Sequence, residues 1–300
     1  MTRNAKRICL AAAVAALLAA CSVEPSPRVI GISNGPEPAA GELEQNIGNL
    51  LQRTSPAYVT LVVHDTTHSV SRMPKDPGDA VTSGSGFVID RAGHVLTAGH
   101  VAVSAGWRVR AHGQDGRTYR GHVVDILKSS DIALVRLERM GDVRPVEPAQ
   151  EPCLALGEPV FSLGKPRRRG DTARLGHVAS MSFGQPVSYQ SFGYPDAMVL
   201  RMQTRKGESG GPVFNSRGEL VGMLVSTLSD GVGNPLDLAH AVTAPMLARF
   251  VCDRLECSPA WRALASRDTA QCPGKRSTPG HTMPRPIEMD VAHPLPVPRS

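Results

Sequence analysis

Ser209 has the clearest chemical context of any residue in the sequence. It lies in the run Gly207–Pro212, which reads GESGGP. A serine hydroxyl is a weak nucleophile unless a neighbouring base takes its proton. The surrounding glycines permit a tight turn, in which the N–H groups of Gly207 and Ser209 would converge on a developing oxyanion. Taken alone, the run also fits a glycine-rich hairpin with an exposed serine.

A base and an acid stand upstream of this serine. His100 lies near the end of Gly86–Val101, a predicted β-hairpin, and histidine titrates near neutral pH. Asp131 stands at the mouth of the apolar run Ile132–Leu137. Either residue alone would usually be structural, but the order His, Asp, Ser with long separations matches one arrangement of a catalytic triad. The pattern predicts a nucleophile, a general base and an orienting acid, and such chemistry needs no metal or cofactor.

Short β-type runs, separated by turn residues, must position these three side chains. Runs of this length and spacing are typical of an all-β sandwich or barrel. A short amphipathic helix is predicted before them over Glu42–Arg53, and Pro56 would close it. The predicted strands are Tyr58–Val63, Ser85–Ile89, His94–Thr97, Trp107–Ala111, Arg117–Ile126, Ala133–Leu137, Pro159–Leu163, Ala173–Ser182, Met198–Thr204, Pro212–Phe214, Leu220–Ser226 and Ala239–Val242.

Composition excludes several classes of protein. The chain has 300 residues, 41% of them hydrophobic, which is too many for a wholly disordered protein. Its net charge of +6 includes three basic residues in the first twenty. The remainder carries 30 basic against 27 acidic side chains, so its net charge of +3 does not indicate a nucleic-acid partner.

The N-terminus is predicted to carry a secretion signal and a site of lipid attachment. Basic residues precede an apolar run, Ile8–Ala20, that is too short to span a bilayer, which is the pattern of a signal peptide over residues 1–20. The run ends in LAAC, which resembles the lipobox of bacterial lipoproteins and implies lipid on Cys21. A plain signal peptide is the alternative. Residues 21–40 would form a flexible tether. Because Ser22 is not Asp, the resemblance gives no inner-membrane retention signal, so we expect the periplasmic face of the outer membrane.

Four cysteines remain for the folded part of a secreted chain. Their pairing is open among Cys153, Cys252, Cys257 and Cys272, and disulfides are favoured over a zinc site because no histidine stands at ligand spacing beside them. His64 and His68 have a helical metal spacing, but their segment is predicted to be strand and loop. Arg167–Arg169 is more typical of a solvated loop than of an anion-binding surface.

The three chemical segments together resemble the catalytic motifs of trypsin-like (chymotrypsin-fold) serine proteases. TAGH at 97–100, DIAL at 131–134 and GESGGP at 207–212 carry this resemblance, and LGEPVFSLGKP at 156–166 is similar to the bacterial high-temperature-requirement (HtrA/Deg) branch. The resemblance implies two six-stranded antiparallel β-barrels, at about 55–140 and 153–250, with the active site between them. Residues 139–152 would join the halves of a domain spanning 41–272. The proline-rich tail, 273–300, is predicted to be disordered.

The sequence departs from this branch in two ways. Too few residues follow the protease region for the peptide-binding PDZ domain usual there, and Glu208 stands where Asn or Asp is usual. The resemblance implies a serine endopeptidase that hydrolyses peptide bonds of envelope proteins through an acyl-enzyme. A catalytically inactive homologue that acts as an envelope binding protein is the alternative, because folds outlive their chemistry.

The same resemblance locates a pocket for the substrate residue before the scissile bond. Its walls would include Gln203, Ser226, Thr227, Leu228 and His240. A pocket for Arg or Lys needs a buried carboxylate, and Gln203 stands at the position where trypsin-like enzymes place it. Cleavage after Val, Ala or Leu is therefore predicted. The alternative is an acidic substrate residue that binds the His240 imidazole.

Overall fold

The computed structural model describes residues 28–30, 40–66, 80–151, 154–165, 172–229 and 235–267. Several predicted features lie outside these residues. They are the signal peptide, Cys21, His68, Cys153, Arg167–Arg169, Cys272 and the tail.

Six antiparallel strands close the first barrel. Their order around it is β2 (Tyr58–His64), β3 (Ala80–Val88), β4 (His94–Ala98), β7 (Ile132–Leu137), β6 (Thr118–Leu127) and β5 (Arg108–Gly113). Along the first half of β6, exposed and buried residues alternate strictly, as expected when one face of a strand meets a core and the other meets water. Inward-facing Val and Leu side chains fill this barrel.

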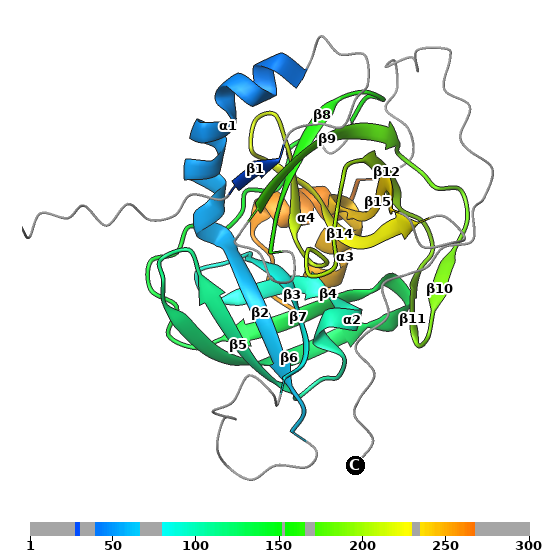
Figure 1. Ribbon diagram of the computed structural model, residues 1–300. Helices are drawn as coiled ribbons and strands as arrows, with labels where there is room; N and C mark the ends of the chain where they lie inside the picture. The colour runs from blue at the N-terminus through cyan, green and yellow to red at the C-terminus, as the bar shows by residue number, and fades with distance from the viewer. Residues whose placement is uncertain are drawn as a thin grey trace, which may run out of the picture.

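The second barrel has the same strand number and closes through the pairing of β8 with β9. Its order is β9 (Thr172–Ser180), β12 (Met198–Arg201), β15 (Pro235–Thr243), β14 (Leu220–Ser229), β13 (Pro212–Asn215) and β8 (Pro159–Gly164). A short strand, β1 (Arg28–Ile30), adds to the outside of β9 in parallel. Figure 1 shows the two barrels, the first in blue through cyan to green and the second in green to yellow.

The two six-stranded antiparallel barrels predicted from the sequence are confirmed. Each of the twelve predicted strands corresponds to an observed one, with ends that differ by a few residues. Three short strands were not predicted: β1, which lies within the expected tether, and the hairpin β10 (Val187–Tyr189) and β11 (Phe192–Tyr194).

Helices flank the barrels. The predicted N-terminal helix is observed as α1 (Ala40–Thr54), which buries Leu43, Leu50 and Leu51. Two helices after the last strand, α3 (Ala244–Cys252) and α4 (Pro259–Ala265), were not predicted. A disulfide joins Cys252, the last residue of α3, to Cys257 in the segment before α4. None of the helices in the described residues is long and apolar enough to cross a membrane.

The connecting segment and the nucleophile-bearing turn hold the two barrels together. In the connector, the N–H of Val146 donates to Val88 of the first barrel at 2.9 Å, and the N–H of Ala149 donates to Leu220 of the second at 3.0 Å. The N–H of Ser85 in β3 donates to the carbonyl of Ser209 at 2.9 Å. The candidate site therefore lies at a junction to which both barrels contribute.

Candidate active site

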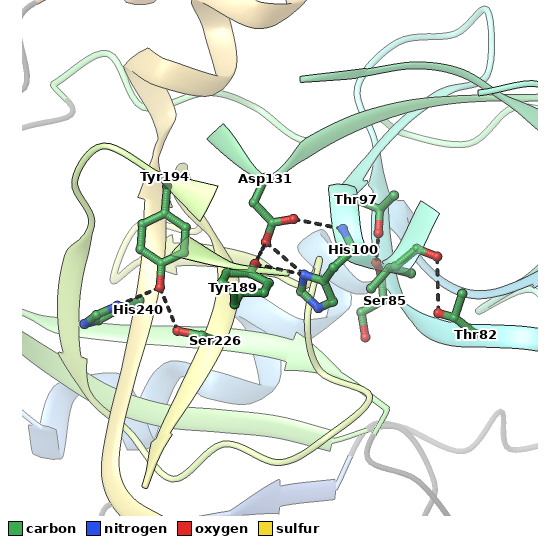
Figure 2. Close-up of polar contacts among 10 residues, drawn as sticks. Thr82, Ser85, Thr97, His100, Asp131, Tyr189, Tyr194, Ser226 and His240 are labelled. Carbon is green, nitrogen blue, oxygen red and sulfur yellow. Dashed lines mark hydrogen bonds and ion pairs between the residues drawn. The ribbon is translucent and has the colours of Figure 1, made fainter. Parts of the chain in front are cut away.

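His100 and Asp131 form a buried pair at the end of the first barrel. His100 lies in the short helix α2 (Gly99–Ala102), directly after β4. Its Nδ1 is 2.8 Å from Oδ2 of Asp131, and its backbone N–H donates to Oδ1 of the same carboxylate at 2.8 Å. Figure 2 shows both contacts. Because an ionised carboxylate only accepts hydrogen bonds, this geometry places the imidazole proton on Nδ1 and leaves Nε2 as the basic nitrogen.

Asp131 owes its position to an unusual backbone conformation. It follows the short 3-10 helix η3 (Lys128–Ser130) and has a φ of 51°, in the left-handed region that Asp tolerates better than most residues. Its own carbonyl accepts the N–H of Gly99 at 3.0 Å. The side chain is 0% exposed, so hydrogen bonds from the protein take the place of those from water.

Ser209 lies on a tight turn that packs against the strand leading to His100. Within the turn, Glu208 donates its N–H to Arg205 and accepts the N–H of Gly211. Gly210 has a φ of 83°, and a Cβ atom there would lie 3.0 Å from the nitrogen of Ala98, two residues before His100. Among the described contacts, no hydrogen bond joins the Ser209 hydroxyl to His100. Hydrogen bonds between catalytic groups are often long in ligand-free enzymes and tighten only with substrate.

Within Gly207–Gly211, the N–H groups differ in whether they have a protein acceptor among the described residues. The N–H groups of Glu208, Gly210 and Gly211 each donate to a carbonyl oxygen. Those of Gly207 and Ser209 donate to no protein acceptor among the described residues. Spare N–H groups on a turn of this kind are suited to bind a developing oxyanion.

A buried ion pair links the turn that carries Ser209 to strand β9. Glu208 and Arg174 of β9 are 1% and 2% exposed, and the guanidinium nitrogens lie 2.8 and 2.7 Å from Oε1 of the glutamate. The other carboxylate oxygen accepts the N–H of Arg205 at 2.8 Å. Burial raises the pKa of Glu208 above its ordinary value, and the neighbouring Arg174 opposes that rise. A Cβ at Gly164 would lie 2.7 Å from Cγ of Glu208, so a glycine is needed to admit this side chain.

A tyrosine that was not predicted, Tyr189, contacts both His100 and Asp131. The hydroxyl of Tyr189, at the end of β10, donates to Oδ2 of Asp131 and lies 3.2 Å from Nδ1 of His100 (Figure 2). The phenol ring meets the imidazole edge to face, with centroids 5.8 Å apart. The one sequence signal for this role is the cluster Tyr189, Phe192 and Tyr194, which holds three of the chain's twelve aromatic residues.

The predicted pocket residues are only partly brought together. Ser226 and His240 pair across β14 and β15, and the hydroxyl of Tyr194 lies 3.0 Å from Ser226 Oγ and 2.8 Å from His240 Nδ1. The neighbouring Leu228 is buried, and Thr227 shares a hydrogen bond of 2.8 Å with Thr204. Gln203 is exposed.

His240 is held neutral at physiological pH. Its side chain is fully buried, and the ring of Phe183 lies over it with centroids 4.4 Å apart. Burial lowers the pKa of His240 to about 4, although the Asp196 carboxylate opposes the shift. A neutral imidazole supplies no positive charge for an acidic substrate residue.

Two other sequence predictions concern metal sites. His64 lies buried as the last residue of β2, one residue beyond the predicted strand Tyr58–Val63, whereas His68 is outside the described residues. No group of three or more potential metal ligands gathers within the described part of the chain. The disulfide between Cys252 and Cys257 uses two of the four cysteines whose pairing was left open.

Comparison with known proteins finds similarity to one type of domain. A family model described as a trypsin-like peptidase domain matches residues 84–223. A serine protease named HhoA from Synechocystis sp. is 33% identical over 55% of this chain and 43% of its own length. A periplasmic serine protease of the do/HhoA-like type from Haemophilus influenzae is 28% identical over 71% of this chain and 51% of its own. The chain thus spans about half or less of the length of these curated relatives.

A solved structure supports the fold independently of sequence. The HtrA-type protease AlgW, solved with a tripeptide, superposes with a TM-score of 0.56 over 66% of this chain and 60% of that structure. The two sequences are 18% identical, so the likeness concerns the fold.

Proposed function

We propose that this chain, whose residues 84–223 match a trypsin-like peptidase domain and which is similar to do/HhoA-like serine proteases, is a serine endopeptidase with Ser209, His100 and Asp131 as its triad. The observation that carries the proposal is the buried His100–Asp131 pair, with Nδ1 2.8 Å from Oδ2, at a junction where the Ser209 turn is bonded to the same barrel. Protein or peptide substrates would bind across this junction.

In the proposed acylation step, the Ser209 hydroxyl oxygen attacks the carbonyl carbon of the scissile peptide bond. The hydroxyl proton passes to Nε2 of His100, and Asp131 holds the resulting imidazolium. The N–H groups of Gly207 and Ser209 bind the oxyanion, an interaction worth about 3–4 kcal/mol for one donor in comparable enzymes. As the tetrahedral intermediate collapses, the C–N bond breaks and His100 gives the proton to the leaving amine.

In the deacylation step, water replaces the amine. His100 takes a proton from the water molecule, whose oxygen attacks the acyl carbon, and the ester bond to Ser209 breaks with return of the proton to its oxygen. Every proton is therefore carried by this chain's own residues.

Replacement of the nucleophile tests the proposal directly. We expect Ser209→Ala to lose casein hydrolysis and labelling by a fluorophosphonate probe, which needs an activated serine. His100→Ala should be about as damaging, because triad members act as a unit. Ser216→Ala, at an exposed serine seven positions along the chain, is the matched control and should keep both activities. Hydrolysis that persists in purified Ser209→Ala would rule out this assignment.

The same probe separates the enzyme from the alternative function. An inactive homologue that acts as an envelope binding protein would keep its fold but take up no fluorophosphonate in the parent protein. An intact His100–Asp131 pair favours the enzyme, since a binding role does not require it.

The proposed pocket includes Gln203, Ser226, Thr227, Leu228 and His240, and we propose cleavage after Val, Ala or Leu. The low pKa of His240, about 4, favours this proposal over selection of an acidic residue, because the imidazole is uncharged at neutral pH. A peptide-library cleavage profile measures the preference. Dominant cleavage after Arg, Lys, Asp or Glu would contradict it.

We further propose that the protein acts in the bacterial envelope, attached through lipid on Cys21 to the periplasmic face of the outer membrane. The relative from Haemophilus influenzae is named as a periplasmic protease, which supports the compartment. The lipobox-like run LAAC supports the anchor.

A further inference from the structure

The hairpin formed by β10 and β11 reaches from the second barrel to the part of the first barrel that carries the catalytic pair. The ring of Phe192 lies where a Cβ at Gly99 would meet it at 3.2 Å, directly beside His100. The ammonium group of Lys128, in η3, lies 5.8 Å from the centroid of the same ring. This packing fixes the hairpin against both segments from which His100 and Asp131 project.

Tyr189 is therefore held with its hydroxyl on the Asp131 carboxylate. Burial, and then the neighbouring charge of Asp131, hold the pKa of Tyr189 well above its ordinary value, so the phenol keeps its proton. A protonated phenol beside an ionised carboxylate is the donor. Oδ2 of Asp131 then accepts from two donors, the Tyr189 hydroxyl and Nδ1 of His100, while Oδ1 accepts the backbone N–H of His100.

We propose that Tyr189 is a positioning residue for catalysis, which orients the Asp131 carboxylate and sets how strongly that carboxylate stabilises the protonated form of His100. The proposal rests on the proposed function, because it assigns a role in the same site. A hydrogen bond to a carboxylate disperses its negative charge and makes it a weaker partner for a neighbouring imidazolium. The hydroxyl also restricts the carboxylate to the orientation that meets Nδ1.

Among the described residues, two further titratable groups lie beside this cluster, one on β11 and one on η3. Tyr194, from β11, lies next to Tyr189 with ring centroids 6.3 Å apart, and Lys128 faces Phe192 on the η3 side. Neither is hydrogen-bonded to the Asp131 carboxylate in the described contacts. Removal of the Tyr189 hydroxyl therefore changes one contact of the acid and leaves its remaining donors in place.

Two changes at Tyr189 test the proposal in opposite directions. In Tyr189→Phe, we expect kcat/KM for a casein-derived peptide to fall about tenfold or more, mainly through kcat. The acid limb of its pH profile should move to higher pH by about half a unit or more, because a less stabilised carboxylate holds the imidazolium more firmly. Incorporation of 3-fluorotyrosine at position 189 gives a more acidic phenol and should move the acid limb to lower pH.

The control removes an equivalent contact elsewhere. The Tyr119 hydroxyl donates to Asp115 in the first barrel, and Tyr119→Phe should lose that bond with no shift of the acid limb. If Tyr189→Phe and the fluorinated protein both keep the parent profile and rate, the proposal is wrong. A melting curve for each protein shows whether it is folded.

A second measurement does not depend on hydrolysis. In the Ser209→Ala background, NMR titration of the His100 ring should move to higher pH when Tyr189→Phe is added. An unchanged titration would overturn the role of Tyr189, even if the protein is a protease. If the titration shifts but the parent hydrolyses nothing, the positioning contact stands and the proposed function fails.

Discussion

At the scale of single residues, Gly210 shows how closely the nucleophile turn fits its surroundings. Its φ is 83°, and a Cβ there would lie 2.2 Å from the carbonyl oxygen of Ser85 and 2.4 Å from Oγ1 of Thr97. Both the backbone conformation and the space therefore require glycine. Gly157 has a similar φ of 80° but no atom within 4 Å of the Cβ position, so only its conformation favours glycine.

This contrast gives a paired prediction. Gly157→Ala should cost about 1–2 kcal/mol of unfolding free energy, the cost of a side chain in a left-handed conformation, with activity retained. Gly210→Ala should cost more, because the backbone of Ser85 must also move, and activity should fall about 100-fold as Ser209 is displaced. Chemical denaturation and peptide hydrolysis measure the two effects. If the two variants lose the same amount of unfolding free energy and of activity, close packing at Gly210 is unimportant.

The triad candidates could be predicted from local sequence motifs, but the residues that hold them in place could not. His100, Asp131 and Ser209 each stand in a recognisable run of neighbours. Tyr189 and Arg174 act through partners 58 and 34 positions away, and no spacing rule connects such residues. These contacts depend on how the hairpin and β9 pack in three dimensions, which only the folded structure specifies.

At the scale of elements, the pair of Arg174 and Glu208 ties β9 to the nucleophile turn. Arg174→Met should destabilise the protein by about 3–5 kcal/mol, because it leaves a buried carboxylate without its partner. The double variant Arg174→Met, Glu208→Leu should recover much of this stability. The double variant should not reach the activity of the parent, since its Glu208→Leu change removes the acceptor for the N–H of Arg205. Loss of stability in the double variant equal to that in the single one would contradict this account.

The single variant also has a predicted pH dependence. Burial already raises the pKa of Glu208 above its ordinary value of 4.5, and loss of Arg174 removes the main opposing influence. A raised folded-state pKa means that the folded protein binds the proton more tightly, so stability falls as pH rises from the unfolded value through the folded one. The difference in Tm between Arg174→Met and the parent should be smaller at about pH 5 than at about pH 8.

Elements with strong patterns were predictable, and short ones were not. Strands such as β6 alternate polar and apolar residues, and α1 repeats leucines at helical spacing, so both could be predicted. The hairpin of β10 and β11 has only three residues in each strand, too few to show a period. The strand β1 exists through its pairing with β9, a tertiary contact that leaves no mark on three residues of sequence.

At the scale of the whole molecule, the proposed attachment to the membrane depends on one residue, Cys21, that lies outside the described part of the chain. We expect Cys21→Ala to release the protein into the soluble fraction or to leave the signal peptide uncleaved, because the thiol is the proposed site of lipid attachment. Fractionation and palmitate labelling of cells test this, with Ser22→Ala as a control that changes the neighbouring residue and keeps Cys21. A parent protein that is soluble and unlabelled would show that the anchor does not exist.

The position of β1 limits how far from the membrane an enzyme anchored in this way can lie. It begins at Arg28, seven residues after Cys21, and a chain of that length spans about 25 Å at most. With lipid on Cys21, as proposed, the edge of the second barrel that carries β1 would stay within that distance of the bilayer. The protease would then act in a thin layer along the membrane and would not reach substrates in the rest of the compartment. Its encounters would be governed by lateral diffusion and by how close to the surface a substrate exposes its cleavable segment.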